Sequence, residues 1–104
     1  MKFLVINTFK KPATSFPQTD VQKMFNDTMK LMEQYRKSGT ILAMYFIPGW
    51  NKAVTIEEHK SADTLLQNLS GHPMADFMNF EIYPVVDNFD EMVKVLAKLL
   101  KVTV

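Results

Sequence analysis

Residues 40–58, TILAMYFIPGWNKAVTIEE, decide the fold, because two β-rich runs flank a turn within this stretch. Residues 40–48 form a continuous apolar run, and residues 51–58 contain consecutive β-branched side chains from Val54 to Ile56. Between the two runs Gly49 follows a proline, a combination that is typical of a turn or a bulge. The stretch therefore predicts either a hairpin or one long strand that a bulge interrupts.

Helical patterns lie on both sides of this stretch. Upstream, apolar residues recur at a period near 3.6 over residues 21–35. Thr19 is predicted to cap this helix, and Gly39 is placed to end it. Downstream, leucines recur on one side of a shorter helix predicted over residues 62–69.

Two further strands and a last helix complete the predicted fold. Residues 2–9, KFLVINTF, and residues 77–85 have the composition of strands, and residues 89–101 again show helical spacing. The order is β-α-β-β-α-β with an extra C-terminal helix, which is the ferredoxin-like order of an α+β protein. No linker or repeat divides the chain, so residues 1–104 are predicted to form one ferredoxin-like α+β barrel domain.

Alternation along the predicted strands indicates that both faces of the sheet carry apolar side chains. Two helices cover only one face of such a sheet. We expect the other face to be mixed in character and to combine the residues Phe3, Val5, Asn7, Thr55, Glu81, Tyr83 and Val85. Monomers rarely leave so apolar a face in water. The sequence therefore predicts a homodimer or higher homo-oligomer, in which the sheet packs on a second copy as in a dimeric α+β barrel.

Composition excludes several classes of protein. The 104 residues carry a formal net charge of +1, and the basic residues form no dense cluster, so we expect no nucleic-acid partner. The chain has no cysteine, which excludes a disulfide scaffold, an iron–sulfur cluster and a thiol nucleophile. Residues 1–9 lack the pattern of a signal peptide, and no run reaches about 18 apolar residues. We therefore expect no signal peptide and a cytoplasmic protein without a membrane partner.

Glycines, prolines and leucines spread over most of the chain carry a resemblance to a known family. They are Gly39, Gly49 with Asn51, residues 61–69, residues 71–74 and residues 81–85, together with the opening residues 1–5. In the identity and order of these residues, the chain resembles the muconolactone isomerase family of dimeric α+β barrels. The resemblance implies assembly between subunits and a proton shift in a small unsaturated lactone without any cofactor. Wider relatives of this barrel include cofactor-independent monooxygenases and stress-response proteins.

Three residues are candidates for acid–base chemistry, namely His72, Glu81 and Tyr83. His72 lies in a Gly-His-Pro turn and titrates near neutral pH. A buried Glu81 would have a raised pKa and could act as a proton shuttle beside Tyr83. The candidate ligand-pocket residues are Asn7, Tyr45, Trp50 and Thr55, of which Trp50 would cover the pocket or anchor an interface.

We expect His59, which follows Glu57 and Glu58, at the solvated end of a strand. These residues lack the third ligand that a zinc site needs, so no metal is expected. The resemblance implies that no organic cofactor is needed either. The main hypothesis is a small-molecule-binding, isomerase-like enzyme that acts on a small apolar or lactone-type compound. The alternatives are a non-catalytic oligomeric binding or structural module and a cofactor-independent monooxygenase-like protein. A cavity with converging polar groups on the mixed face favours the enzyme, and a filled face favours the module.

Overall fold

The computed structural model describes residues 1–10, 18–49 and 51–103. In chain order the elements are β1 (Lys2–Phe9), α1 (Gln18–Ser38), β2 (Ile41–Ile47), β3 (Lys52–Glu58), α2 (Ala62–Ser70), the short 3-10 helix η2 (Ala75–Phe77), β4 (Met78–Val85) and α3 (Phe89–Leu100). The predicted order of elements is confirmed. Helix α1 begins at Gln18, so Thr19 lies in its first turn and not at the predicted cap position. Within the described ranges, no helix has both the length and the apolar character needed to cross a membrane.

Strands β2 and β3 form an antiparallel hairpin, which decides between the two predicted alternatives. Ile47 pairs with Lys52 across the turn. Gly49 (φ +83°) and Asn51 (φ +53°) adopt the left-handed backbone conformation, which glycine and asparagine tolerate better than other residues. The register also shifts once within β2, just after Ile41.

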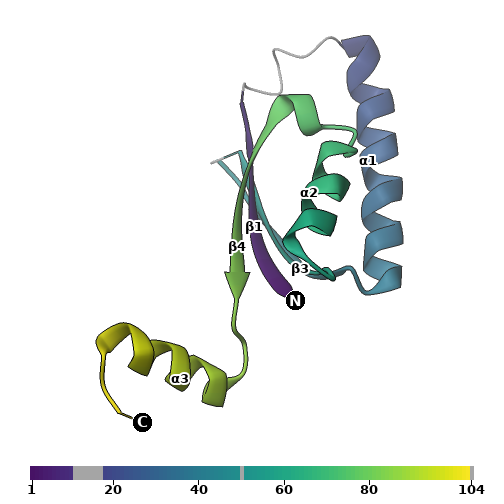
Figure 1. The fold of residues 1–104 in the computed structure, drawn as a ribbon. Coiled ribbons are helices and arrows are strands. Elements are labelled where there is room, and N and C mark those ends of the chain that lie inside the picture. Colours follow the sequence, from purple (N-terminus) through teal and green to yellow (C-terminus); the bar gives the residue numbers. More distant parts are fainter. Residues whose placement is uncertain (11–17, 50, 104) are drawn as a thin grey trace.

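The four strands form one sheet in the order β2-β3-β1-β4, and every neighbouring pair is antiparallel. This is the ferredoxin-like arrangement that the sequence predicted. Figure 1 shows α1 and α2 together on one side of the sheet, which we call the inner face. The opposite side, the outer face, has no helix over it in this structure.

The pairing registers correct the predicted composition of the sheet faces. Val5 on the inner face pairs with Ile82, and Ile6 on the outer face pairs with Glu81. Glu81 and Tyr83 therefore lie on the outer face, whereas Asn7 and Thr55 lie on the inner face. The predicted mixed face that combined all four polar residues was wrong. Alternation divides each strand into two sets of residues, but it does not say which sets of different strands share a face.

The hydrophobic core lies between the sheet and α2. Phe3 and Val5 from β1 pack with Leu65 and Leu69 from α2, and the partly buried side chains of Phe80 and Ile82 extend this cluster. Ser61 caps α2, because its Oγ accepts a hydrogen bond from the backbone N–H of Thr64 at 3.2 Å. Among the described side chains of α1, only Thr28 is buried. The half of the inner face under α2 is therefore filled, and the half under α1 is not.

Helix α3 projects from the end of β4, away from the sheet and from the other helices (Figure 1). The chain measures 58 × 28 × 22 Å, and its radius of gyration is 16.5 Å. A compact chain of this length would have a radius of gyration of about 13 Å. The C-terminal helix that the sequence predicted is present, but it adds no residue to the core cluster.

Two adjacent leucines of α2 test the location of the core. Leu65 is fully buried and Leu66 is 52% exposed. We expect Leu65→Ala to lower the free energy of unfolding by about 2–5 kcal/mol, because it leaves a cavity in the packed core. The control Leu66→Ala should change it by no more than about 0.5 kcal/mol. Urea denaturation followed by circular dichroism measures both values, and equal losses for the two variants would contradict the assigned core.

Candidate functional site

A cavity of about 350 Å³ lies in the unfilled half of the inner face, between the sheet, α1 and the end of α2. Five methionines contribute to its wall, namely Met29, Met32, Met44, Met74 and Met78. The polar groups that line it are Asn7, Thr28, Tyr35, Thr55, Glu57, Asn68 and His72. Methionine side chains are flexible and adapt to ligands of different shape, and a volume of this size holds a small molecule.

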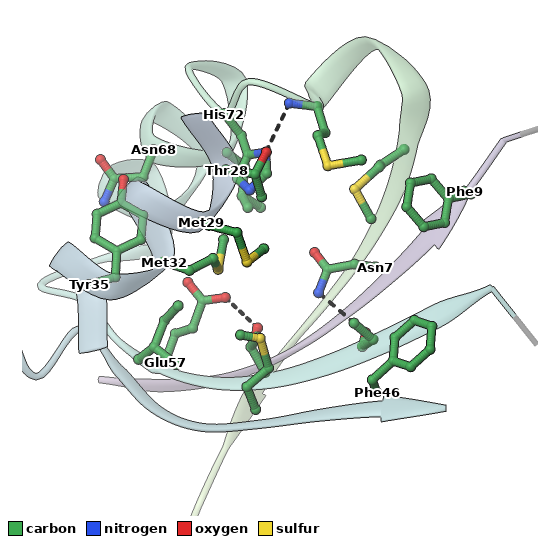
Figure 2. Close-up of a pocket in the computed structure, with 17 residues that line it drawn as sticks. Asn7, Phe9, Thr28, Met29, Met32, Tyr35, Phe46, Glu57, Asn68 and His72 are labelled. Carbon is green, nitrogen blue, oxygen red and sulfur yellow. Dashed lines mark hydrogen bonds between the residues drawn. The ribbon is translucent and has the colours of Figure 1, made fainter. Parts of the chain in front are cut away.

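A buried carboxylate lies on the sheet side of this cavity. Thr55, Glu57 and His59 alternate along β3 and its continuation, so their side chains point to the same inner face. Glu57 is 6% exposed. Its Oε1 accepts a hydrogen bond from Nε2 of His59 at 2.9 Å, and its Oε2 accepts one from Oγ1 of Thr55 (Figure 2 draws the latter). Donors on both oxygens offset much of the cost of burying this charge.

His59 does not itself line the cavity. It contacts Glu57 on the side of the carboxylate that lies away from the cavity. With Nε2 donating to Glu57, Nδ1 is left to accept from the side-chain amide of Asn68, which lies 3.5 Å away. The backbone of His59 exchanges two hydrogen bonds with Met1, of 2.9 and 3.0 Å. His59 is 6% exposed, so its predicted place at a solvated strand end was wrong. The strand does end there, but α2 covers its inner face.

His72 lies on the helical side of the cavity, just after α2. Its Nδ1 accepts a hydrogen bond from the backbone N–H of Met74 at 3.0 Å (Figure 2). Its ring meets that of Phe80 edge-on, with 6.3 Å between the ring centroids. Burial lowers the pKa of His72 below its ordinary value of 6.5, and the charge of Glu57 opposes this effect. At neutral pH the ring is therefore uncharged, and it carries its proton on Nε2 because Nδ1 is the acceptor.

Two further hydroxyl groups enter the cavity from α1. Thr28 is 6% exposed, and among the described residues its Oγ1 has no hydrogen-bond partner. A buried hydroxyl without a partner is unusual, and in the wall of a cavity it is free to bond a molecule that enters. The pKa of Tyr35 is raised by burial and by the charge of Glu57, so its hydroxyl keeps its proton at neutral pH. Thr28, Tyr35 and His72 thus provide hydrogen-bond donors opposite the Glu57 carboxylate (Figure 2).

The structure divides the residues that the sequence singled out between two faces. Asn7, Thr55 and His72 line the cavity. Tyr45, Glu81 and Tyr83 lie on the outer face, where the Tyr83 hydroxyl donates to Glu81 at 2.9 Å. Trp50 lies outside the described residues. The expectation that these polar groups aim into one cavity is therefore wrong for the three outer-face residues, since the registers of β2 and β4 turn them away from it.

Sequence reasoning missed Glu57, His59 and Thr28 as site residues. The signal for the first two was their period of two with Thr55, which continues the inner-face set past the end of β3. Thr28 lies in the apolar stripe of α1, but no sequence pattern reveals that its hydroxyl lacks a partner among the residues that the structure describes. In the part of the chain that the structure describes, no group of three His, Asp or Glu residues could hold a metal ion.

Comparisons with known proteins agree with the resemblance read from the sequence. A model of the muconolactone delta-isomerase family matches residues 1–90. The crystal structure of muconolactone isomerase at 3.3 Å resolution superposes with a TM-score of 0.74 and 21% sequence identity. The match covers 86% of this chain and 92% of that one, and at this identity it shows a shared fold. A search of curated proteins found no match.

Two threonines test the assignment of the cavity hydroxyls. Thr28→Val removes a buried hydroxyl that has no partner in the described part of the chain, so we expect the free energy of unfolding to stay unchanged or to rise by up to about 1 kcal/mol. Thr55→Val removes a donor to a buried carboxylate, and we expect a loss of about 1–3 kcal/mol. Chemical denaturation measures both values. A destabilised Thr28→Val variant would mean that the hydroxyl has a structural partner.

The environment of His72 predicts a pH dependence of stability. Its folded-state pKa is lowered, so the unfolded chain takes up the proton first as the pH falls. The stabilising contribution is present above the ordinary pKa of 6.5 and is lost as the pH falls through the folded-state value. His72→Asn keeps an acceptor for the Met74 N–H but cannot titrate. Urea denaturation above and below this pH window should show that a fall in pH lowers the free energy of unfolding less in the variant than in the wild type. Equal decreases in both proteins would contradict the assignment.

Proposed function

The chain belongs to the muconolactone delta-isomerase family, and we propose that it is an enzyme that moves a proton within a small unsaturated lactone or a similar carbonyl compound, without a cofactor. One observation carries this proposal: a buried carboxylate, Glu57, faces a methionine-lined cavity and is held by His59 and Thr55. Carboxylates fixed in apolar cavities are typical acid–base groups. The family description names the same type of reaction.

The proposed step begins when the Glu57 carboxylate removes a proton from the saturated γ carbon of the ligand, which is bonded to the carbon–carbon double bond that is conjugated with the carbonyl group. The electron pair of the broken C–H bond spreads onto the carbonyl oxygen as a dienolate. Glu57, now a carboxylic acid, returns the proton to the other end of the allylic system. One C–H bond breaks, another forms and the double bond moves, so the step consumes no oxidant and no reductant.

Donors opposite Glu57 would stabilise the oxygen on which this negative charge develops. The Nε2–H of His72 is the first candidate, because Nδ1 is occupied by Met74 and the ring is uncharged. The Thr28 hydroxyl is the second, since it has no partner among the described residues. Hydrogen-bond donors aimed at developing charge in a site shielded from water contribute strongly to catalysis. His59 acts on the carboxylate alone, as a positioning residue.

The charges around the cavity favour an uncharged substrate. Glu57 is the acidic residue of the lining, and no lysine or arginine occurs among the described lining residues. A ligand carboxylate placed near Glu57 would experience repulsion that the apolar wall does not screen. We therefore propose that neutral lactones bind better than lactones that carry a carboxylate, such as muconolactone, with a difference of about ten-fold or more.

We also propose that the chain associates with a second copy, as a homodimer or a larger assembly, through its outer face. Exposed apolar side chains on that face support this proposal, among them Tyr45, Ile47 and Tyr83. An apolar surface of this kind is usually covered. A cytoplasmic location belongs to the same proposal, and the cysteine-free composition is compatible with it.

Solvent exchange tests the catalytic proposal. We expect the protein to catalyse deuterium incorporation from D2O into β-angelica lactone, a neutral unsaturated lactone, with the exchange followed by proton NMR. Glu57→Gln should reduce the rate by about 100-fold or more, because an amide cannot accept the proton. Ligand-observed NMR should show that this variant still binds the lactone. Muconolactone, assayed in parallel, should bind more weakly.

The matched control for this experiment is Glu81→Gln, which makes the same change on the outer face, where Glu81 contacts Tyr83. This variant should exchange at the wild-type rate. Equal decreases of the exchange rate in Glu57→Gln and Glu81→Gln would mean that Glu57 is not the group that moves the proton. Binding without any exchange by the wild-type protein would favour the non-catalytic binding module.

A further inference from the structure

The cavity over the inner face is larger than a single lactone ring requires. Its volume is about 350 Å³. A dry apolar cavity of about 150 Å³ holds benzene, which has as many non-hydrogen atoms as a five-membered unsaturated lactone without substituents. About 200 Å³ of the cavity is therefore left when such a ring is bound, which is more space than the ring itself needs. A ligand that fills the cavity has to carry a further group of atoms.

The Glu57 carboxylate and two phenyl rings lie at opposite ends of this cavity. Four residues separate Glu57 from Ala53 along β3, so the sheet side of the cavity extends for about 13 Å between them. Ala53 pairs with Phe46 on β2. In Figure 2 the rings of Phe9 and Phe46 lie at the end away from Glu57 and Tyr35. A lactone ring from which Glu57 takes a proton therefore leaves the other end unoccupied.

The other end of the cavity is apolar. Phe9, Phe46, Ala53 and Met78 line it, and we call these four residues the tail subsite. Asn7 lies beside them, but its Nδ2 already donates to the backbone oxygen of Ala53 at 3.2 Å. The tail subsite has no charged side chain that could balance a carboxylate or a phosphate of a ligand. A hydrocarbon chain matches this lining, because it needs no hydrogen bond and its transfer out of water is favourable.

The exposure of Phe46 points to the same kind of ligand. This ring is 62% exposed, although it lines the cavity. Phe46 lies on the inner face with Ala53, so a second copy that covers the outer face would leave the ring in water. A ligand chain that runs along the sheet away from Glu57 would cover it, and the burial of aromatic surface is favourable. Met44, which pairs with Thr55 between the two ends, can adapt its side chain to such a chain.

We propose that the ligand of this cavity is a lactone with an apolar chain of about four to six carbon atoms on its γ carbon, and that the tail subsite binds this chain. A methylene group is close in size to a water molecule, whose share of liquid volume is about 30 Å³, so a chain of this length fits the remaining space. The inference rests on the proton transfer proposed above, because Glu57 fixes the position of the ring. It adds the part of the substrate that the reaction leaves unchanged.

A series of γ-alkyl butenolides with methyl, butyl, hexyl and decyl chains tests this inference. The methyl member is β-angelica lactone. Isothermal titration calorimetry on the full chain should show that the dissociation constant falls about two- to four-fold for each methylene group added from methyl to hexyl. The decyl chain exceeds the space and should bring no further gain. The value of kcat/KM for deuterium exchange should rise from methyl to hexyl as well, because binding of the chain also stabilises the transition state.

Two phenylalanines of similar exposure provide a variant and its matched control. Phe46→Ala removes a ring of the tail subsite, and it should weaken binding of the hexyl lactone by about five-fold or more while the methyl lactone stays within about two-fold. The control Phe25→Ala removes a ring of α1 that is 55% exposed and does not line the cavity. It should leave both dissociation constants unchanged. Because both rings are exposed, both variants should fold.

The outcomes separate failure of the tail subsite from failure of the proton transfer. Exchange of the lactones by the wild-type protein with the same affinity for every chain length would overturn the tail subsite and leave the proton transfer intact. Affinity that rises with chain length without any exchange would overturn the proton transfer and support the tail subsite. An equal rise of affinity in wild type and Phe46→Ala would mean that the chain binds elsewhere, and it would overturn the tail subsite.

Discussion

Strand β1 is the constraint on which the rest of the structure depends, because it is hydrogen-bonded along both edges and so fixes the faces of β3 and β4 together. Val5 pairs with Thr55 on one side and with Ile82 on the other. A slip of one residue between β1 and β3 would turn Glu57 out to the opposite face and bring Ile56 under the helices. The cavity, its carboxylate and the apolar outer face all follow from this one register.

The two helices over the inner face have different roles. Helix α2 supplies Leu65 and Leu69 to a packed core, whereas α1 supplies a wall of flexible side chains and the Thr28 hydroxyl to a hollow. Stability can thus come from the α2 half, while the α1 half keeps space for a ligand. The Glu57 carboxylate lies between these two halves of the inner face. Its hydrogen-bond donors come from β3 and the continuation of β3, so the position of the carboxylate does not depend on the flexible methionine side chains.

The order of elements was predictable from sequence, since each strand and helix carries its own period and the turns are marked by Gly39 and Gly49. The site was only partly predictable. His72, Asn7 and Thr55 were found, but Glu81 and Tyr83 were assigned to the wrong face, because the phase of β4 relative to β1 is set by hydrogen bonding between strands. The burial of His59 depends on α2 covering a strand end, which is a tertiary contact that local patterns do not contain.

The methionine wall of the cavity also has a chemical consequence. Thioethers react with peroxides, and the product, methionine sulfoxide, is polar and bulkier. Met29 and Met44 are each 46% exposed, whereas Met78 is buried deeper in the same wall. An oxidant would therefore reach the outer part of the wall first and make it polar while the core around Leu65 stays intact. Oxidative stress would thus weaken the binding of apolar ligands by a chain that is still folded, and methionine sulfoxide reductases would restore the binding.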